Sequence, residues 1–477
     1  MSAPSLTTRR QFLQMSGYAA AAGSLGSGAH AWGDTTQGAR PMQAWVTADT
    51  RRFAKFGVPA WKPADEKTRP VVQIDPRTWY QEILGFGGAF TDASCYLFSQ
   101  LNAADRAALL HDLYGPDGLR FSVGRICIGS SDYTTSVYSF DESTDPDPDL
   151  ARFSIDHDRA YILPTLRDAR QLNPDLFLFS APWSPPGWMK LNHSMLGGSM
   201  NRTYFAPYAQ YFVKFLQSYA AAGVTVQAST IQNEVDTDQN GSMPACIWSQ
   251  QDEVVFVKKY LGPALRAASL DTKIWILDHN YNLWGRVIDQ LSDPDLCKYV
   301  DGVAWHIYEG TVDSISHVHN AFPSQNMYAT EYGAVITSPD FETDWSEWSE
   351  TFTGVLRNWS RSIVGWNLAL DERGNPNKGP GQSGGIVTIH SGTQKITRCG
   401  QYWAFAHFSK VIQRGARVLS STGDMPNLSH VAFTNPDGRH VLVLTNRGGL
   451  EMQVPCRFEE TETLVTMPAN SVVTLQW

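Results

Sequence analysis

Short apolar runs alternate with longer amphipathic segments from residue 84 onward. The predicted strands are 84–90, 121–128, 176–183, 225–234, 273–280, 302–309, 326–332 and 362–370. Between them, apolar residues recur with the 3.6-residue period of a helix in segments such as 93–113, 158–172, 205–222 and 251–269. Strands that alternate with helices in this way predict parallel βα units.

The number of units favours one architecture. Eight βα units in about 300 residues predict a (β/α)8 barrel, here within residues 84–400. An open, doubly wound sheet is the alternative, but such a sheet usually carries a GxGxxG turn after its first strand. The first run of this chain reads GFGGAF instead, which does not match that turn.

The pattern changes outside the barrel region. Residues 412–477 alternate apolar and polar positions in short runs, separated by turn signals such as NPDG, which predicts an antiparallel β unit, in this case a sandwich. Residues 43–80 are also strand-like. We therefore expect both ends of the chain to build one second domain. The stretch 141–150, DESTDPDPDL, is expected to form a polar loop after the second barrel strand.

The first 31 residues have the order of a bacterial export signal. The pair Arg9–Arg10 is followed by Phe12–Leu13, a weakly apolar Ala/Gly stretch and a small-residue motif that ends at Ala31. This order predicts a twin-arginine signal peptide and a periplasmic or secreted protein. A non-targeting Ala/Gly tail is the alternative. No later stretch reaches the roughly 18 apolar residues of a membrane span.

Composition narrows the classes of partner. The net charge is −9 and the chain has no block of Lys or Arg, which argues against nucleic acid or an anionic membrane surface as partner. Apolar residues make up 42% of the 477 positions, and the 16 Trp suit flat, partly apolar ligands such as sugar rings. The six cysteines show no metal-binding spacing and are either free or partly paired.

The predicted strand ends carry the residues of chemical interest, because barrel enzymes place their chemistry at the carboxyl ends of the strands. These residues are Asp92, Asp132, Trp183, Asn233, Glu234, Asp278, His279, His306, Tyr308, Glu331, Trp366 and Asn367. Glu234 ends the fourth strand and Glu331 the seventh, so the two can face each other across the mouth. Two opposed carboxylates are what a glycosidase needs.

Other readings of these residues remain. A single strand-end Glu is more often an ion-pair partner, and Trp183 or Trp366 alone can be packing. A metal-dependent barrel hydrolase could use the set Asp278, His279, His306 and Glu331. It is disfavoured because the first strand has no His-x-His pair and no strand end offers a bridging Lys. A non-catalytic sugar-binding protein is expected to lack one of the two carboxylates.

Five ordered motifs resemble a known family: GFGGAFTDA, SAPWSPPGWMK, IQNE, ATEYG and GWNLAL. Together with QYWAFAHFSKVIQRGARV, they resemble glycoside hydrolase family 30, the glucosylceramidase-like β-glycosidases, over roughly residues 43–477. The resemblance implies a retaining mechanism on a barrel with a β-sandwich. It implies Glu234 as acid/base and Glu331 as nucleophile, and such a mechanism requires no metal or organic cofactor.

The resemblance also implies the surroundings of the two glutamates. The positions that match the sugar subsite are Asp132, Trp183, Asn233, Tyr308 and Trp366, and the residues expected to support the carboxylates are Arg125 and His306. We expect burial and nearby negative charge to raise the pKa of the Glu234 carboxyl to about 6–7, near the operating pH. The expected partner is a β-glycoside or oligosaccharide.

The sequence does not fix which sugar and aglycone the enzyme accepts. Glucosylceramidase-like, β-xylosidase, β-fucosidase and β-1,6-glucanase activities all suit a Trp-walled subsite. Where the family often reads Asn-Glu-Pro, Val235 follows Glu234 in this chain. We therefore expect the loop 235–248 to shape an unusual aglycone site rather than one for ceramide.

Overall fold

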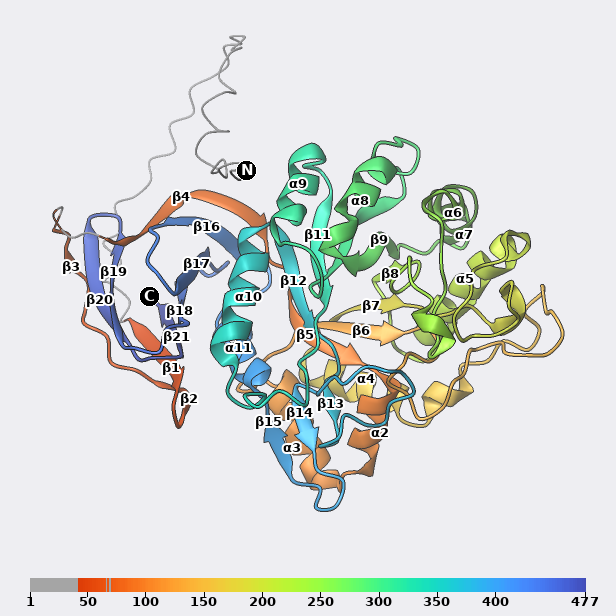
Figure 1. Cartoon of the computed structure of the whole chain (residues 1–477), viewed down its shortest axis with the longest axis horizontal. Helices are drawn as coiled ribbons and strands as arrows, with labels where there is room; N and C mark the ends of the chain where they lie inside the picture. Colours follow the sequence, from red (N-terminus) through yellow and green to blue (C-terminus); the bar gives the residue numbers. More distant parts are fainter. Residues whose placement is uncertain (1–41, 66, 68–69) are drawn as a thin grey trace, which may run out of the picture. The chain divides into compact units, whose positions relative to one another are not determined.

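A computed structural model describes residues 42–65, 67 and 70–477. The predicted twin-arginine segment, residues 1–31, lies outside these described residues. Within them, eight parallel strands close into a barrel (Figure 1). The barrel strands are β5 (Gly85–Phe90), β6 (Val123–Cys127), β7 (Phe177–Ala181), β8 (Ala228–Thr230), β9 (Lys273–Asn280), β10 (Val300–His306), β11 (Asn326–Glu331) and β12 (Ser360–Gly365).

Helices surround the barrel strands (Figure 1). They are α2 (Asp92–Gln100), α3 (Ala103–Tyr114), α4 (Ile162–Leu172), α5 (Phe205–Ala221), α6 (Gln250–Phe256), α7 (Gly262–Ala267), α8 (Trp284–Leu291), α9 (Asp313–Ala321), α10 (Trp345–Arg357) and α11 (Gly400–Ser409). In α4 the buried residues include Ile162, Leu166 and Ala169, which lie on one face. The predicted alternation of strands and helices is therefore confirmed.

Two predicted helices are interrupted. The segment 93–113 forms two helices, because Leu101 is extended and the side chain of Asn102 caps the first turn of α3. The segment 251–269 forms α6, a π-helical turn over Val257–Leu261, and α7. Pro263 lies in the first turn of α7, where its missing N–H cannot continue a regular helix from α6.

Two predicted strands are also shorter than expected. The segment 225–234 contains only the three residues of β8, and 362–370 splits into β12 and a separate strand, β13 (Ala369–Leu370). Glu234 and Asn367 have φ values of 52° and 69°, so the backbone leaves the extended region at both. A non-glycine residue held there costs on the order of 1–3 kcal/mol, and such strain collects at functional sites.

The glycines of the first barrel strand permit close packing. A β-carbon at Gly87 would lie 1.6 Å from the carbonyl oxygen of Val123 on β6. At Gly88 it would lie 2.7 Å from a methyl group of Leu368. The GFGGAF sequence is therefore explained by close approach of neighbouring segments.

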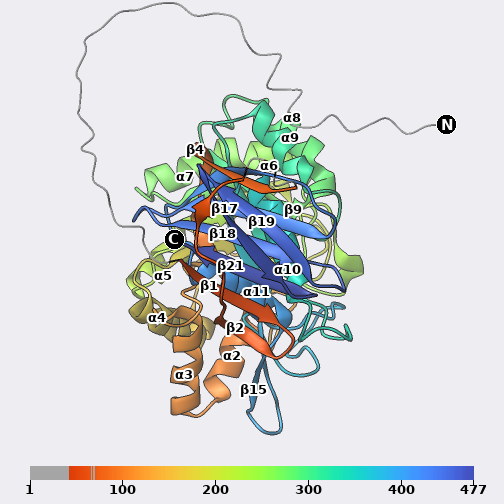
Figure 2. The ribbon, with the colours of Figure 1, turned by 90° about the vertical axis from the view of Figure 1, so that its left-hand side faces the viewer.

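The second domain is a β-sandwich built from both ends of the described chain. Its sheet has the order β2 (Arg51–Lys55), β1 (Gln43–Ala48), β21 (Ser471–Gln476), β18 (His440–Asn446), β17 (Leu428–Thr434), β16 (Arg417–Thr422), β4 (Val72–Glu82), β19 (Met452–Phe458), β20 (Thr461–Met467) and β3 (Lys62–Pro63). Strand β1 pairs with β21, and β4 with β16, both antiparallel (Figures 1 and 2). The pairing of β4 with β19 is parallel, which differs from the expected purely antiparallel unit.

The barrel and the sandwich share buried contacts through α10 and α11. His407 on α11 lies 2.8 Å from Thr474 of β21 and 2.8 Å from Thr47 of β1. Burial lowers the pKa of His407 to about 3, so the ring is neutral in the folded protein. On α10, the hydroxyl of Ser349 lies 2.7 Å from that of Thr445. A small sheet of β13, β14 (Val387–Ile389) and β15 (Ile396–Arg398) follows the last barrel strand.

The described residues were also compared with the requirements for a membrane span and for disulfide bonds. None of the helices described has the length and apolarity needed to span a lipid bilayer. All six cysteines are free, and all except Cys297 are buried.

Candidate active site

The structure brings the predicted site residues together at the carboxyl end of the barrel. A cleft of about 220 Å³ is lined by Asp132, Trp183, Asn233, Glu234, Gln239, Met243, Tyr308, Glu331, Trp366, Pro380, Gly381 and Ser383. The set includes both predicted glutamates and all five residues expected in the sugar subsite. Arg125 and His306 are fully buried and contact the two glutamates.

Glu331 is held by hydrogen bonds to both of its carboxylate oxygens. It is the last residue of β11, as predicted, and is 6% exposed. The Arg125 guanidinium donates to one oxygen, and the Tyr308 hydroxyl donates to the other over 2.9 Å. Two hydrogen bonds, one of them from a cation, fix the orientation of this carboxylate.

Asp278 provides the countercharge that keeps Arg125 in place. At the end of β9, it accepts from the Arg125 guanidinium over 2.7 Å. Burial opposes the charge on Arg125, but Asp278 and Glu331 outweigh it and raise the pKa of Arg125 above its usual value. Burial likewise opposes ionisation of Asp278, while Arg125 and His306 hold the pKa of that carboxyl well below its usual range. Asp278 is thus fully engaged by protein groups.

Glu234 reaches the cleft from an irregular turn beyond β8. Its backbone N–H donates to the carbonyl of Asp278 over 3.1 Å, and that of Asn233 donates to the carbonyl of Pro182 over 2.8 Å. These bonds to neighbouring strand ends hold Glu234 at its positive φ of 52°. The side chain of Asn233 accepts from Arg125 over 2.8 Å, which links the turn to the site of Glu331.

Histidines surround the carboxylate of Glu234. His306 Nδ1 lies 3.3 Å from Glu234 Oε1, and His279 Nδ1 lies 3.8 Å from the same oxygen. The amide of Gln239 donates to Oε2 over 3.0 Å. Burial raises the pKa of Glu234, but His306, His279 and Gln239 outweigh burial, so the pKa lies below its usual value. The expectation of a raised pKa is therefore wrong for the unliganded site, because the neighbouring groups favour the charged form.

His306 contacts both glutamates. Its Nε2 atom lies 3.1 Å from Asp278 Oδ1 and 3.6 Å from Glu331 Oε2. Burial lowers the pKa of this histidine, but the surrounding carboxylates, led by Glu331, outweigh burial and raise the pKa to about 9.

The raised carboxyl pKa of the cleft belongs to Asp132. Burial, followed by the negative charges of Glu331 and Glu234, raises the pKa of Asp132 to about 8. One of its oxygens, Oδ1, is buried without a hydrogen-bond partner. Asp132 is therefore protonated near neutral pH and has hydrogen-bonding capacity left for a ligand.

The two tryptophans form a stacked pair. The rings of Trp183 and Trp366 lie 4.9 Å apart with an interplanar angle of 18°, and the side chains are 2% and 3% exposed. The Arg125 guanidinium lies 4.7 Å from the Trp183 ring. The pair thus forms an apolar wall that also packs against the buried cation.

Three residues of this network, Asp278, His279 and Gln239, were not among the predicted site residues. Asp278 was recognisable as a strand-end carboxylate, but its role in holding Arg125 depends on a contact between residues 153 positions apart. Gln239 gave no sequence signal, because it lies in an irregular loop and reaches Glu234 only through the fold of that loop.

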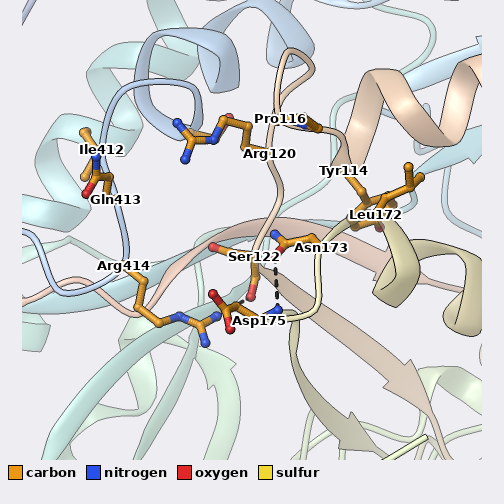
Figure 3. A pocket seen from close by; sticks show the side chains of 11 residues that line it. Tyr114, Pro116, Arg120, Ser122, Leu172, Asn173, Asp175, Ile412, Gln413 and Arg414 are labelled. Atoms are coloured by element: carbon orange, nitrogen blue, oxygen red, sulfur yellow. Dashed lines mark hydrogen bonds between the residues drawn. The ribbon is translucent and has the colours of Figure 1, made fainter. Parts of the chain in front are cut away.

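A larger cavity, of about 390 Å³, lies at the opposite end of the barrel (Figure 3). It is bordered by residues that precede the strands, such as Ser122 before β6 and Asp175 before β7. Arg414 points across it and donates to the carbonyl of Ser122 over 2.6 Å. Because the amino end of a barrel serves stability and this cavity has one carboxylate rather than an opposed pair, the smaller cleft is the better candidate.

Comparison with known proteins agrees with this geometry. The sequence profile of the glycosyl hydrolase family 30 TIM-barrel domain matches residues 83–412, and that of the family 30 beta sandwich domain matches residues 415–475. The endo-1,6-beta-D-glucanase of Neurospora crassa is 37% identical, over 83% of this chain and 85% of the relative. The putative glucosylceramidase 1 of Caenorhabditis elegans is 31% identical, over 79% and 76%.

Solved structures give the same picture. The endo-beta1,6-glucanase BT3312 superposes with a TM-score of 0.83 at 29% identity, covering 91% of this chain and 99% of that protein. SrfJ from Salmonella typhimurium superposes with a TM-score of 0.87 at 26% identity, covering 92% and 99%. On the matched profiles and these relatives, this chain belongs to glycosyl hydrolase family 30 and is a glycosidase.

Proposed function

We propose that this protein is an endo-acting β-1,6-glucanase that works with retention, using Glu331 as nucleophile and Glu234 as acid/base. The observation that carries the proposal is the convergence of these two glutamates on one cleft, from the end of β11 and from the turn after β8. Paired carboxylates on either side of a glycosidic bond are the minimum machinery for its hydrolysis.

In the first step, Glu331 attacks the anomeric carbon. Arg125 and Tyr308 fix the orientation of its carboxylate, and Trp183 and Trp366 form an apolar wall of the cleft. Glu234 donates a proton to the leaving oxygen. Burial is the largest influence on its pKa and acts upward, so a sugar that expels water from the cleft shifts Glu234 toward the protonated form.

In the second step, the roles follow microscopic reversibility. The product with the free hydroxyl leaves, and Glu234, now a carboxylate, removes a proton from the water that releases the sugar from Glu331. The histidine and amide contacts of Glu234 favour its charged form, which is the form this step requires.

Three cleft residues are assigned to the sugar. Protonated Asp132 offers a donor and an unpartnered oxygen to hydroxyl groups. Asn233, whose carbonyl oxygen is occupied by Arg125, is assigned to the 2-hydroxyl through its amide nitrogen. Tyr308 is 42% exposed and is assigned to the edge of the subsite.

The choice of β-1,6-glucan over glucosylceramide is supported by two relatives that are named for that activity, one by sequence and one by structure. The loop beyond Glu234 contributes Gln239 and Met243 to the cleft. Glucosylceramide hydrolysis is the second candidate, since other relatives at 31% identity are named for it.

The test uses the purified enzyme, a linear β-1,6-glucan and glucosylceramide in detergent micelles. We expect rapid hydrolysis of the glucan, with a spread of oligosaccharide sizes early in the reaction, and little release from glucosylceramide. Proton NMR in the first minutes should show the β-anomer. Release of glucose alone would exclude endo action, preference for glucosylceramide would favour the second candidate, and an initial α-anomer would exclude retention.

We also propose that residues 1–31 direct export through the twin-arginine route, which suits an enzyme that acts on an extracellular polysaccharide. The support is the order of the arginine pair, the apolar stretch and the small-residue motif. Replacing Arg9 and Arg10 by Lys should retain the protein in the cytoplasm of a bacterial host. Unchanged export of that variant would contradict the proposal.

A further inference from the structure

Three side chains around the acid/base position form a group of metal-ligating type. Among the described residues, Glu234, His279 and His306 each place a ligand atom within 4.8 Å of the others. The donors are Glu234 Oε1, His279 Nδ1 and His306 Nδ1, which come from three different barrel segments. Two imidazoles and one carboxylate are a common donor set for zinc.

The spacing of these donors fits a tetrahedral ion. Two donors on tetrahedral Zn²⁺, with bonds of about 2.0–2.2 Å, lie about 3.4 Å apart. His306 Nδ1 lies 3.3 Å from Glu234 Oε1, and His279 Nδ1 lies 3.8 Å from it. Both distances are close to that value, and all three donor atoms lie within 4.8 Å of one another.

In each histidine, the other ring nitrogen lies within hydrogen-bond distance of a carboxylate. His279 Nε2 lies 2.6 Å from Asp236 Oδ1, and His306 Nε2 lies 3.1 Å from Asp278 Oδ1. Metal-binding histidines usually donate their second ring N–H to such a partner, which fixes the tautomer and leaves the first nitrogen as a ligand. Both rings direct Nδ1 at Glu234, and an ion bound there takes the place of the proton on His306 Nδ1.

His279 has a ring nitrogen without a partner beside Glu234. The side chain is buried, with 7% of its surface exposed, and its Nδ1 has no hydrogen-bond partner. Nε2 is engaged by Asp236, so Nδ1 is the ring atom left to bind a ligand, and it lies 3.8 Å from Glu234 Oε1.

We propose that Glu234, His279 and His306 form a site for Zn²⁺ or a similar first-row transition-metal ion, which inhibits the enzyme reversibly. The imidazole donors favour such ions over Mg²⁺ or Ca²⁺. Of the three ligands, Glu234 lines the cleft. Inhibition rests on the proposed function, because a metal-bound Glu234 carboxylate holds no proton and cannot act as general acid.

The experiment titrates the chelator-treated enzyme with ZnCl2 by isothermal titration calorimetry and follows hydrolysis of an aryl β-glycoside in parallel. We expect saturable binding of one ion, loss of activity over the same concentration range, and full recovery with EDTA. Co²⁺ in place of Zn²⁺ should give the intense visible absorption of a four-coordinate site, which is independent of turnover.

Two variants test the ligands separately. His279→Gln removes one donor and should weaken Zn²⁺ binding at least about 10-fold. Asp236→Asn leaves all three donors and removes only the partner of His279, and should weaken binding roughly 10–100-fold. The matched control is His317→Gln on α9. His317 also lies 3.8 Å from a carboxylate, that of Asp313, but its side chain is 53% exposed. This control should leave binding and activity unchanged.

The outcomes separate the site from the catalytic assignment. Equal Zn²⁺ affinity in the wild type, His279→Gln and Asp236→Asn would overturn the proposal, and so would the absence of a four-coordinate Co²⁺ spectrum. A third outcome is that both variants weaken Zn²⁺ binding but bound Zn²⁺ does not reduce turnover of the wild type. This result would support the metal site and would contradict Glu234 as the acid/base.

Discussion

The two glutamates of the cleft are supported in opposite ways. Glu331 ends a regular strand, and a buried cation and a phenol bind its two oxygens. Glu234 lies in an irregular turn at a positive φ, with two histidines and an amide around it. One carboxylate is fixed in orientation by a cation and a phenol, whereas the other lies among two imidazoles and an amide.

This difference matches the division of work in a retaining glycosidase. A nucleophile must stay ionised and aimed at one carbon atom, whereas an acid/base must change its protonation state twice in each cycle. Rigid support by a cation suits the first task. The histidine and amide neighbours suit the second, because they favour the charged form of Glu234 that must accept a proton. The following experiments test the contrast in order of decreasing expected effect.

Glu331→Gln should cause the largest loss. Without a nucleophile no glycosyl-enzyme forms, so turnover should fall by more than the ~10⁴-fold that general acid–base catalysis contributes at most. The measurement is steady-state hydrolysis of aryl β-glycosides, with circular dichroism to check folding. Near-wild-type turnover in a folded variant would show that Glu331 is not the nucleophile.

Glu234→Gln should cost roughly 10²–10⁴-fold on substrates with poor leaving groups. Substrates with activated leaving groups, such as dinitrophenyl glycosides, should still form the glycosyl-enzyme and then stall. Azide should restore turnover, because it needs no general base. An equal loss on both substrate types, with no effect of azide, would remove the functional distinction between the two glutamates.

Asp132→Asn should separate activity from stability. Activity should fall because a hydroxyl-binding group changes, whereas stability at alkaline pH should rise. The pKa of Asp132 is raised to about 8 in the folded protein, so the folded state binds more protons than the unfolded state between about pH 4 and 8. The contribution of Asp132 to the free energy of unfolding therefore declines as pH rises through this window, by at most about 1.4 kcal/mol per pH unit.

The measurement for this variant is chemical denaturation of wild type and Asp132→Asn at pH 5 and pH 8. The difference in unfolding free energy should favour the variant more at pH 8 than at pH 5. A difference that is the same at both pH values would mean that Asp132 does not retain its proton when the protein folds.

Tyr308→Phe removes the hydrogen bond that the Tyr308 hydroxyl donates to Glu331. The bond to the ionised Glu331 is charge-assisted, so its loss should cost about 1.5–3 kcal/mol of transition-state stabilisation, or roughly 10–150-fold in kcat/KM. The loss should be similar for good and poor leaving groups, because the nucleophile serves both. A loss confined to poor leaving groups would place Tyr308 on the acid/base side instead.

Gln239→Ala should have the smallest effect. Gln239 is only partly buried and bonds to Glu234 Oε2 over 3.0 Å, so water can replace it, and kcat should fall by less than about 10-fold. The loss should be larger for poor leaving groups, which depend on proton donation. An equal loss for all leaving groups would indicate a general role in loop structure rather than support of the acid/base.

Much of the fold was predictable, because strand and helix periods are local properties of the chain. The positions of the barrel strands, the joining of both chain ends in one sandwich, and Glu331 at the end of β11 all follow from such patterns. The errors arose where one residue interrupts a pattern. Asn102 divides a helix, and Asn367 at φ 69° divides a strand, although the apolar spacing continues past both.

The sequence by itself placed Glu331 at the end of a strand and Glu234 at the same barrel mouth, although Glu234 lies in a turn beyond β8, and its motifs indicated the family. Only the tertiary structure decided which carboxyl of the cleft has a raised pKa. The expected high pKa belongs to Asp132 rather than Glu234, because His279 and His306 arrive from β9 and β10 to face Glu234. A pKa depends on charges within a few ångströms in space. The spacing of residues along the chain does not encode those distances.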